Sequence, residues 1–111
     1  MQIINKQNVK IVEDVCGQIA EMYQSDNLSI SIATISKSST PHKHQKTEEV
    51  YFVLSGSGTI FIGGEVLKIN QGDLVPIPKD VFHHVESDGS TLEILTVTHP
   101  KYNPKDIIAK K

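Results

Sequence analysis

Short runs of β-type residues recur along this chain, each closed by a turn signal, and this regularity limits its fold more than any other feature. From residue 27 onward, Leu28, Ile30 and Ile32 alternate with smaller residues, which is the period-two pattern of a strand. Further β-type runs follow at residues 50–54, 59–62, 66–69, 74–77, 81–85 and 92–98. About seven short strands with turn signals between them predict an all-β antiparallel sandwich or barrel rather than an α/β fold.

The two ends of the chain give weaker patterns. Within the first 25 residues, Ile19 and Met22 suit one face of a helix, whereas Ile11 and Val12 suit a short strand. Both interpretations stay open for that region. The segment 100–111 is mostly polar and is expected to form either a single helical turn or a frayed end.

Composition and charge exclude several classes of protein. A chain of 111 residues and 12.3 kDa has the size of one domain with its own core, so residues 1–111 are expected to form a single domain. Its net charge of −2 offers no basic stripe for nucleic acid. No apolar run approaches the roughly 20 residues of a membrane span. The lone Cys16 cannot form an internal disulfide and is expected to be a small buried side chain, which agrees with a cytoplasmic location.

Three of the five histidines and one glutamate are the candidate functional residues of the sequence. His42 and His44 are two residues apart, so in a strand they project to the same face. Glu49 has the wrong parity for that face, and the chain is therefore expected to turn or bulge around residues 46–47. His83 lies on a separate predicted strand. Imidazoles and a carboxylate in this pattern indicate a site for a metal ion.

The same residues resemble the two motifs of the cupin superfamily. The first motif, G-x5-H-x-H-x(3,4)-E-x6-G, matches residues 42–56 as His42-x-His44-x4-Glu49-x6-Gly56. The second motif, G-x5-P-x-G-x2-H-x3-N, matches residues 72–87 as Gly72-x5-Pro78-x-Asp80-x2-His83. The sequence around Glu49 also resembles that of the small single-domain cupins that are called mannose-6-phosphate isomerase-like.

Three positions depart from these motifs. Ser36, Asp80 and Ser87 stand where the family has glycine, glycine and asparagine. All three lie at turn positions, where Asp and Ser are acceptable, so the departures affect loops more than the ligand set.

The resemblance implies a jelly-roll-like antiparallel β-barrel with one divalent transition metal ion bound by His42, His44, Glu49 and His83. Three imidazoles and one carboxylate suit Mn, Fe, Co, Ni, Zn or Cu, and the ligand type does not choose among them. Glu48 is the alternative carboxylate, although only Glu49 keeps the family spacing to the following glycine. A cupin whose histidines line a pocket without a metal is a further alternative.

For function, the resemblance implies an enzyme of isomerase or dioxygenase type, acting on a small sugar-like or oxygenated organic substrate chelated at the metal. Glu49 would serve as ligand and general base, and Tyr51 would orient the substrate. The alternative is a non-catalytic module that binds or senses a small molecule, because the fold serves both roles.

The remaining histidines and the oligomeric state complete the expectations. His84 is expected to face away from the metal by strand alternation, and His99 is expected to be a surface or subunit-contact residue. Small cupins resembling this chain commonly pair through edge strands. A homodimer is therefore expected, with residues 3–12 supplying an edge strand.

Overall fold

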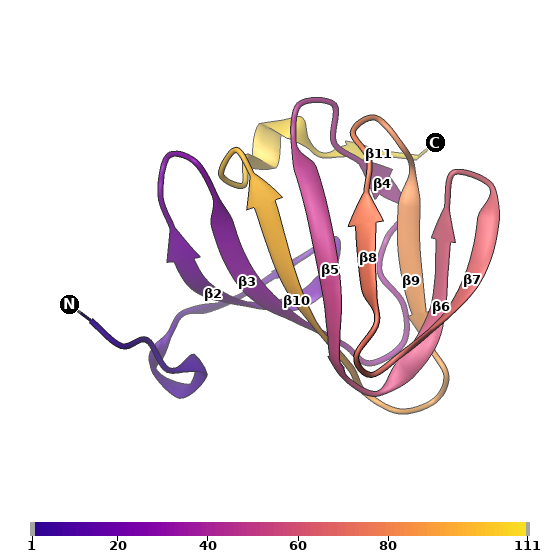
Figure 1. Cartoon of the computed structure of the whole chain (residues 1–111), viewed down its shortest axis with the longest axis horizontal. Helices are drawn as coiled ribbons and strands as arrows, with labels where there is room; N and C mark the ends of the chain where they lie inside the picture. The colour runs from indigo at the N-terminus through magenta and orange to yellow at the C-terminus, as the bar shows by residue number, and fades with distance from the viewer. Residues whose placement is uncertain (1, 111) are drawn as a thin grey trace.

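The computed structural model describes residues 2–110, which form two antiparallel β-sheets packed against each other (Figure 1). The six-stranded sheet contains, in spatial order, β1 (Ile11–Asp14), β2 (Gly17–Gln24), β3 (Ser29–Ile35), β10 (Leu92–His99), β5 (Glu48–Ser55) and β8 (Leu74–Ile77). The five-stranded sheet contains β11 (Ile108–Ala109), β4 (His42–Lys43), β9 (His83–Ser87), β6 (Ser57–Ile62) and β7 (Glu65–Asn70). Two short 3-10 helices are η1 (Lys6–Asn8) and η2 (Pro104–Asp106). Across residues 2–110, no helix has the length and apolar character needed to cross a membrane.

The all-β, jelly-roll-like prediction is confirmed, but the two sheets do not close into a barrel. Among the described residues, the free edges are β1 and β8 in one sheet and β11 and β7 in the other. The chain passes from β5 to β6, and so from one sheet to the other, through the single residue Gly56 at φ +83°. A Cβ there would lie 2.4 Å from the carbonyl oxygen of Thr91, so this sharp corner requires glycine.

The N-terminal region is β-structure, and the helical interpretation of Ile19 and Met22 is wrong. Strand β2 pairs with both β1 and β3, with a register shift between Glu21 and Tyr23. Ile19 and its neighbour Ala20 are both buried, although they point to opposite faces of the strand. The bulge and this pair of adjacent buried residues hide the period of two that identifies a strand.

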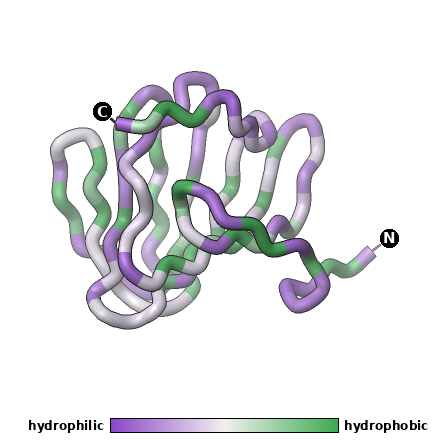
Figure 2. The backbone as a smooth tube through the Cα atoms, turned by 180° about the vertical axis from the view of Figure 1, so that it is seen from behind, coloured by the Kyte–Doolittle hydropathy of each residue, from purple (hydrophilic) through white to green (hydrophobic). Residues whose placement is uncertain are grey.

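The hydrophobic core fills the space between the sheets. Hydrophobic and hydrophilic stretches both occur along the strands (Figure 2). The buried core cluster consists of Ile35, Tyr51, Val53, Ile60, Ile69, Ile77, Val85, Leu92 and Ile94. Both sheets contribute to this cluster, so they share one hydrophobic core, which fixes the position of one sheet relative to the other.

Candidate metal centre

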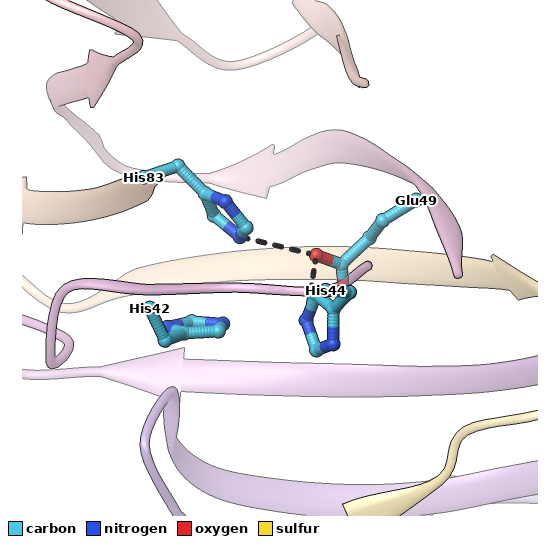
Figure 3. Close-up of side chains that lie close together, drawn as sticks. All are labelled: His42, His44, Glu49 and His83. Carbon is cyan, nitrogen blue, oxygen red and sulfur yellow. Dashed lines mark ion pairs between the residues drawn. The ribbon is translucent and has the colours of Figure 1, made fainter. Parts of the chain in front are cut away.

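Four buried side chains, His42, His44, Glu49 and His83, converge between the two sheets (Figure 3). One potential ligand atom from each lies within 4.8 Å of the others. The four residues are at most 5% exposed. The structure thus brings together the four residues that the sequence predicts as ligands, and His42 and His83 lie directly opposite each other where β4 pairs with β9.

Backbone contacts fix the orientation of two of these imidazoles. Nδ1 of His42 lies 2.7 Å from the carbonyl oxygen of Thr40, and Nδ1 of His83 lies 3.0 Å from that of Val81. A carbonyl oxygen only accepts, so in each ring Nδ1 donates and the neutral ring keeps its lone pair on Nε2. Histidine ligands of metals in proteins are commonly held by this type of contact.

Three other polar atoms of the cluster lack partners within the described residues. Nε2 of His44, Nε2 of His83 and Oε1 of Glu49 are buried and have no hydrogen-bond partner within residues 2–110. Oε1 of Glu49 lies 3.3 Å from Nε2 of His83 and 3.7 Å from Nε2 of His44, as Figure 3 shows. Buried polar atoms are normally partnered, and a cation among these converging atoms would satisfy all of them. The cluster therefore fits a divalent metal ion.

The environment of His42 favours the form that binds metals. Burial lowers its pKa to about 4, and the nearby His83 and His44 add to this effect against the opposing contacts with Thr40 and Glu49. The imidazole of His42 is consequently uncharged at neutral pH. Histidine must be uncharged to coordinate a metal ion.

A carboxylate from the C-terminal segment shapes the loop that leads to Glu49. Asp106 accepts hydrogen bonds from the backbone N–H of Gln45 (3.1 Å) and Lys46 (3.0 Å) and from the hydroxyl of Thr47 (3.0 Å). Burial opposes its ionisation, but these donors outweigh burial and keep the pKa of Asp106 below its ordinary value. The expected turn around residues 46–47 is present, and Asp106 anchors it. Nothing in the polar tail of the sequence pointed to this role.

A cavity of about 290 Å³ adjoins the cluster, and His42, His44 and Glu49 line it. Other lining residues come from β1, β2, β3, β10 and the C-terminal segment. They include Asp14, Cys16, Glu21, Ser31, Thr98 and Tyr102. A metal ion held by the cluster would therefore face a space that can admit a small molecule.

Cys16 lies at the site, which the sequence did not predict. Its sulfur is 3.8 Å from Nε2 of His42 and 4.0 Å from the hydroxyl of Tyr51. Burial, followed by the charges of Glu49 and Asp14, raises the pKa of the Cys16 thiol well above its ordinary value. Cys16 thus presents a neutral thiol to the cavity. Its position follows from the pairing of β1 with β2, in the region where the sequence pattern was ambiguous.

The other candidate residues occupy different places. Tyr51 is 4% exposed and belongs to the core cluster, and it is not among the residues that line the cavity. Glu48 is exposed. His84 points away from the cluster and stacks on Phe61, with ring centroids 4.4 Å apart. Nδ1 of His99, on the surface, lies 2.7 Å from a backbone carbonyl oxygen.

Comparison with known proteins relates this geometry to a family. An uncharacterized protein of Aquifex aeolicus is 28% identical over 97 residues, which cover 87% of this chain and 78% of the relative. A gentisate 1,2-dioxygenase of Haloferax sp is 26% identical over 83 residues, which cover 75% of this chain and 23% of that enzyme.

Among solved structures, a variant of Streptomyces PAC13 with uridine matches with a TM-score of 0.87 and 13% identity, over 100% of this chain and 92% of that chain. PAC13 is described as a nucleoside dehydratase, and at this identity the likeness shows a shared fold. The model of the cupin domain family matches residues 31–98, which include all four residues of the candidate metal centre. This chain belongs to the cupin family.

Proposed function

We propose that this cupin is a metal-dependent enzyme that acts on a small oxygenated organic molecule, by proton transfer of the isomerase type. The observation that carries the proposal is that His42, His44 and Glu49 belong to the candidate metal centre and also line the cavity. A divalent ion held there would supply a Lewis acid that polarises substrate oxygens, or a redox-active centre for reactions with dioxygen.

Glu49 is the proposed general base. It lines the cavity, and its Oε1 atom has no hydrogen-bond partner within residues 2–110. A carboxylate in this position can take a proton from a substrate carbon or hydroxyl and return it elsewhere.

Tyr51 is proposed to position Glu49 rather than to contact the substrate, because it does not line the cavity. Burial, with Cys16 and Glu49 nearby, raises the pKa of Tyr51 well above its ordinary value. Its hydroxyl therefore stays protonated and can act as a donor beside Glu49.

Two relatives support an enzyme, each for a different reaction. PAC13, which shares the fold, is described as a nucleoside dehydratase. The relation in sequence to gentisate 1,2-dioxygenase supports a dioxygenase as the second candidate.

The test begins with elemental analysis of tag-free protein and reloading with each candidate metal. Isomerisation and oxygen-uptake screens with small sugars, diketones and phenolics would follow. We expect metal-dependent turnover that Glu49→Gln abolishes and that His84→Ala, the matched control on the outer face, preserves. Oxygen uptake would favour the dioxygenase, and binding of a ligand without turnover would contradict both and favour a binding module.

A further inference from the structure

The wall of the cavity carries acidic side chains but no lysine or arginine. Asp14 and Glu21 line it together with Glu49, whereas none of the lysines within residues 2–110 does. The sequence contains no arginine, because all 11 basic residues are lysines. The guanidinium group of arginine, which binds phosphate and carboxylate groups through two parallel hydrogen bonds, is therefore absent from this chain.

A metal ion would reduce this negative charge without reversing it. A divalent ion would balance two of the three carboxylates of Asp14, Glu21 and Glu49 if all were ionised. Burial raises the pKa of Asp14, and with Asp14 neutral the carboxylates of Glu21 and Glu49 would still balance the two charges of the ion. An anionic ligand would meet like charge on the carboxylates of the wall and would lose its hydration without gaining a lysine or arginine partner.

Hydroxyl groups of a ligand, in contrast, could form hydrogen bonds with polar atoms of the cavity wall. Thr98 lines the cavity directly opposite Glu49 on the neighbouring strand and is 4% exposed. Its Oγ1 atom is buried and has no hydrogen-bond partner within residues 2–110. Thr96, two residues earlier on the same face, already donates to the carbonyl oxygen of Ser31 at 3.4 Å. Thr98 is therefore the threonine whose hydroxyl is left for a ligand.

Asp14 offers acceptors on the other side of the cavity. It accepts hydrogen bonds from the backbone N–H of Cys16 (2.7 Å) and from the hydroxyl of Tyr102 (3.3 Å). These contacts hold Asp14 in the wall, and each carboxylate oxygen retains a further lone pair that can accept from a ligand hydroxyl. The volume of about 290 Å³ lies just below the roughly 300–1,000 Å³ usual for small-molecule sites, so the ligand should be small.

We infer that the cavity selects an uncharged, hydroxyl-bearing small molecule, such as a free sugar or nucleoside, and discriminates against its phosphorylated or carboxylated counterpart. This inference rests on the proposed function, since it names the substrate class of the same cavity. It also predicts that this protein does not take the sugar phosphates that a resemblance to mannose-6-phosphate isomerase-like cupins would suggest as substrates.

Calorimetric titration of the metal-loaded protein with matched pairs tests this selection. The pairs are uridine with uridine 5′-monophosphate, and free hexoses with their 6-phosphates and uronic acids. We expect the uncharged member to bind about tenfold more tightly or better, which corresponds to about 1.4 kcal/mol. Equal or tighter binding of the charged members, or no binding of any uncharged member up to about 10 mM, would overturn the inference.

A charge-reversal pair tests whether the wall causes the selection. Glu21 is exposed at the cavity, and Glu65 is exposed but outside it, so Glu21→Lys and Glu65→Lys change the net charge equally. Glu21→Lys should reduce the preference for the uncharged member severalfold, while Glu65→Lys should leave it unchanged. An equal effect of both variants would show that overall charge, and not the cavity, sets the preference.

Thr98→Val and Thr96→Val test the hydroxyl contact. Loss of one hydrogen bond to the ligand should weaken binding about fivefold in Thr98→Val, whereas Thr96→Val should change it less than about twofold. Melting curves of both variants would verify that they are folded. Equal binding by both variants would refute the role of Thr98.

The inference and the proposed function can fail separately. Turnover of anionic substrates would refute the selection and leave the proposed enzyme intact. Uncharged ligands that bind without turnover would support the selection and refute the proposed enzyme.

Discussion

Nε2 of His83 lies 3.3 Å from Oε1 of Glu49. When the imidazole of His83 is uncharged, these two atoms present lone pairs to each other. The orientation of His83 is fixed because its Nδ1 faces the carbonyl oxygen of Val81. Two buried acceptors at this separation repel each other unless a proton or a metal ion lies between them. A bound cation is therefore the arrangement in which this part of the fold has all its polar atoms satisfied.

The first prediction concerns the metal ligands. Changing His42, His44 or His83 to Ala should abolish tight metal binding, because each removes one of the converging nitrogen atoms. Changing His84 or His99 to Ala should leave about one ion per chain, because both lie outside the cluster. Elemental analysis of the purified variants gives the stoichiometry. An empty site in His84→Ala with a filled site in His83→Ala would mean that the register of β9 is wrong by one residue.

The sequence predicted the strands and residues whose neighbours follow a simple repeat. The alternation of serine and isoleucine in β3 and the continuous β-type runs of β5 and β10 identify these strands, and burial alternates along β5 and β10. His42 and His44 could be paired for the same reason, since two residues along a strand return to the same face.

The residues that the sequence did not predict depend on contacts between distant segments. Asp106 acts on a loop about 60 residues earlier, and no local pattern encodes such a contact. Cys16 reaches His42 because β1 and β2 pair beside the site, in the region where the sequence suited both a helix and a strand. The open edges of the sheets likewise depend on which strands meet, which alternation does not determine.

The second prediction is that Asp106→Asn weakens the loop between His44 and Glu49. Asp106 accepts three hydrogen bonds there, and an amide can replace only some of them. We expect the free energy of unfolding to fall by about 1–3 kcal/mol and the metal to bind less tightly. The control is Asp88→Asn, because Asp88 accepts its hydrogen bonds from Ser57 and Ser90 at an exposed turn. Urea unfolding and metal titration measure both effects, and equal losses in the two variants would contradict the role of Asp106.

The third prediction concerns acid sensitivity of the chelated protein. The pKa of His42 is lowered from 6.5 to about 4 in the folded state, so the unfolded chain binds the proton first as the pH falls. This contribution to stability is fully present above pH 6.5 and decreases toward pH 4, by roughly 3 kcal/mol at about 1.4 kcal/mol per pKa unit. Urea unfolding between pH 7.5 and 4 measures it, and His42→Gln should flatten the curve. A wild-type curve that is already flat in this range would contradict the prediction.

The fourth prediction is a homodimer formed through the edge of the six-stranded sheet. Within residues 2–110, strand β1 pairs only with β2, which leaves its other edge open in this part of the chain. The segment before it projects from the two-sheet body (Figure 1), and Ile3 and Ile11 are 98% and 52% exposed. Pairing with a second copy would satisfy the backbone of this edge and bury these side chains.

Light scattering at micromolar concentration measures this assembly. Ile11→Lys should produce a monomer, while Leu67→Lys, a matched change on the exposed strand β7, should leave the dimer intact. A wild-type monomer would refute the prediction.

The last prediction is that the metal-free protein stays folded. The core cluster between the sheets contains nine buried side chains, none of which belongs to the metal centre, so the core persists without an ion. A ligand that binds only the folded state adds RT ln(1 + [L]/Kd), about 2.7 kcal/mol at a hundredfold excess over Kd. Chelation should therefore lower the melting temperature by several degrees while the β-type circular dichroism signal at pH 7.5 is retained. Complete unfolding on chelation would show that the ion is structural, and an unchanged melting temperature in protein with verified metal content would show that binding is weak. Either result would contradict a functional ion bound to a self-sufficient fold.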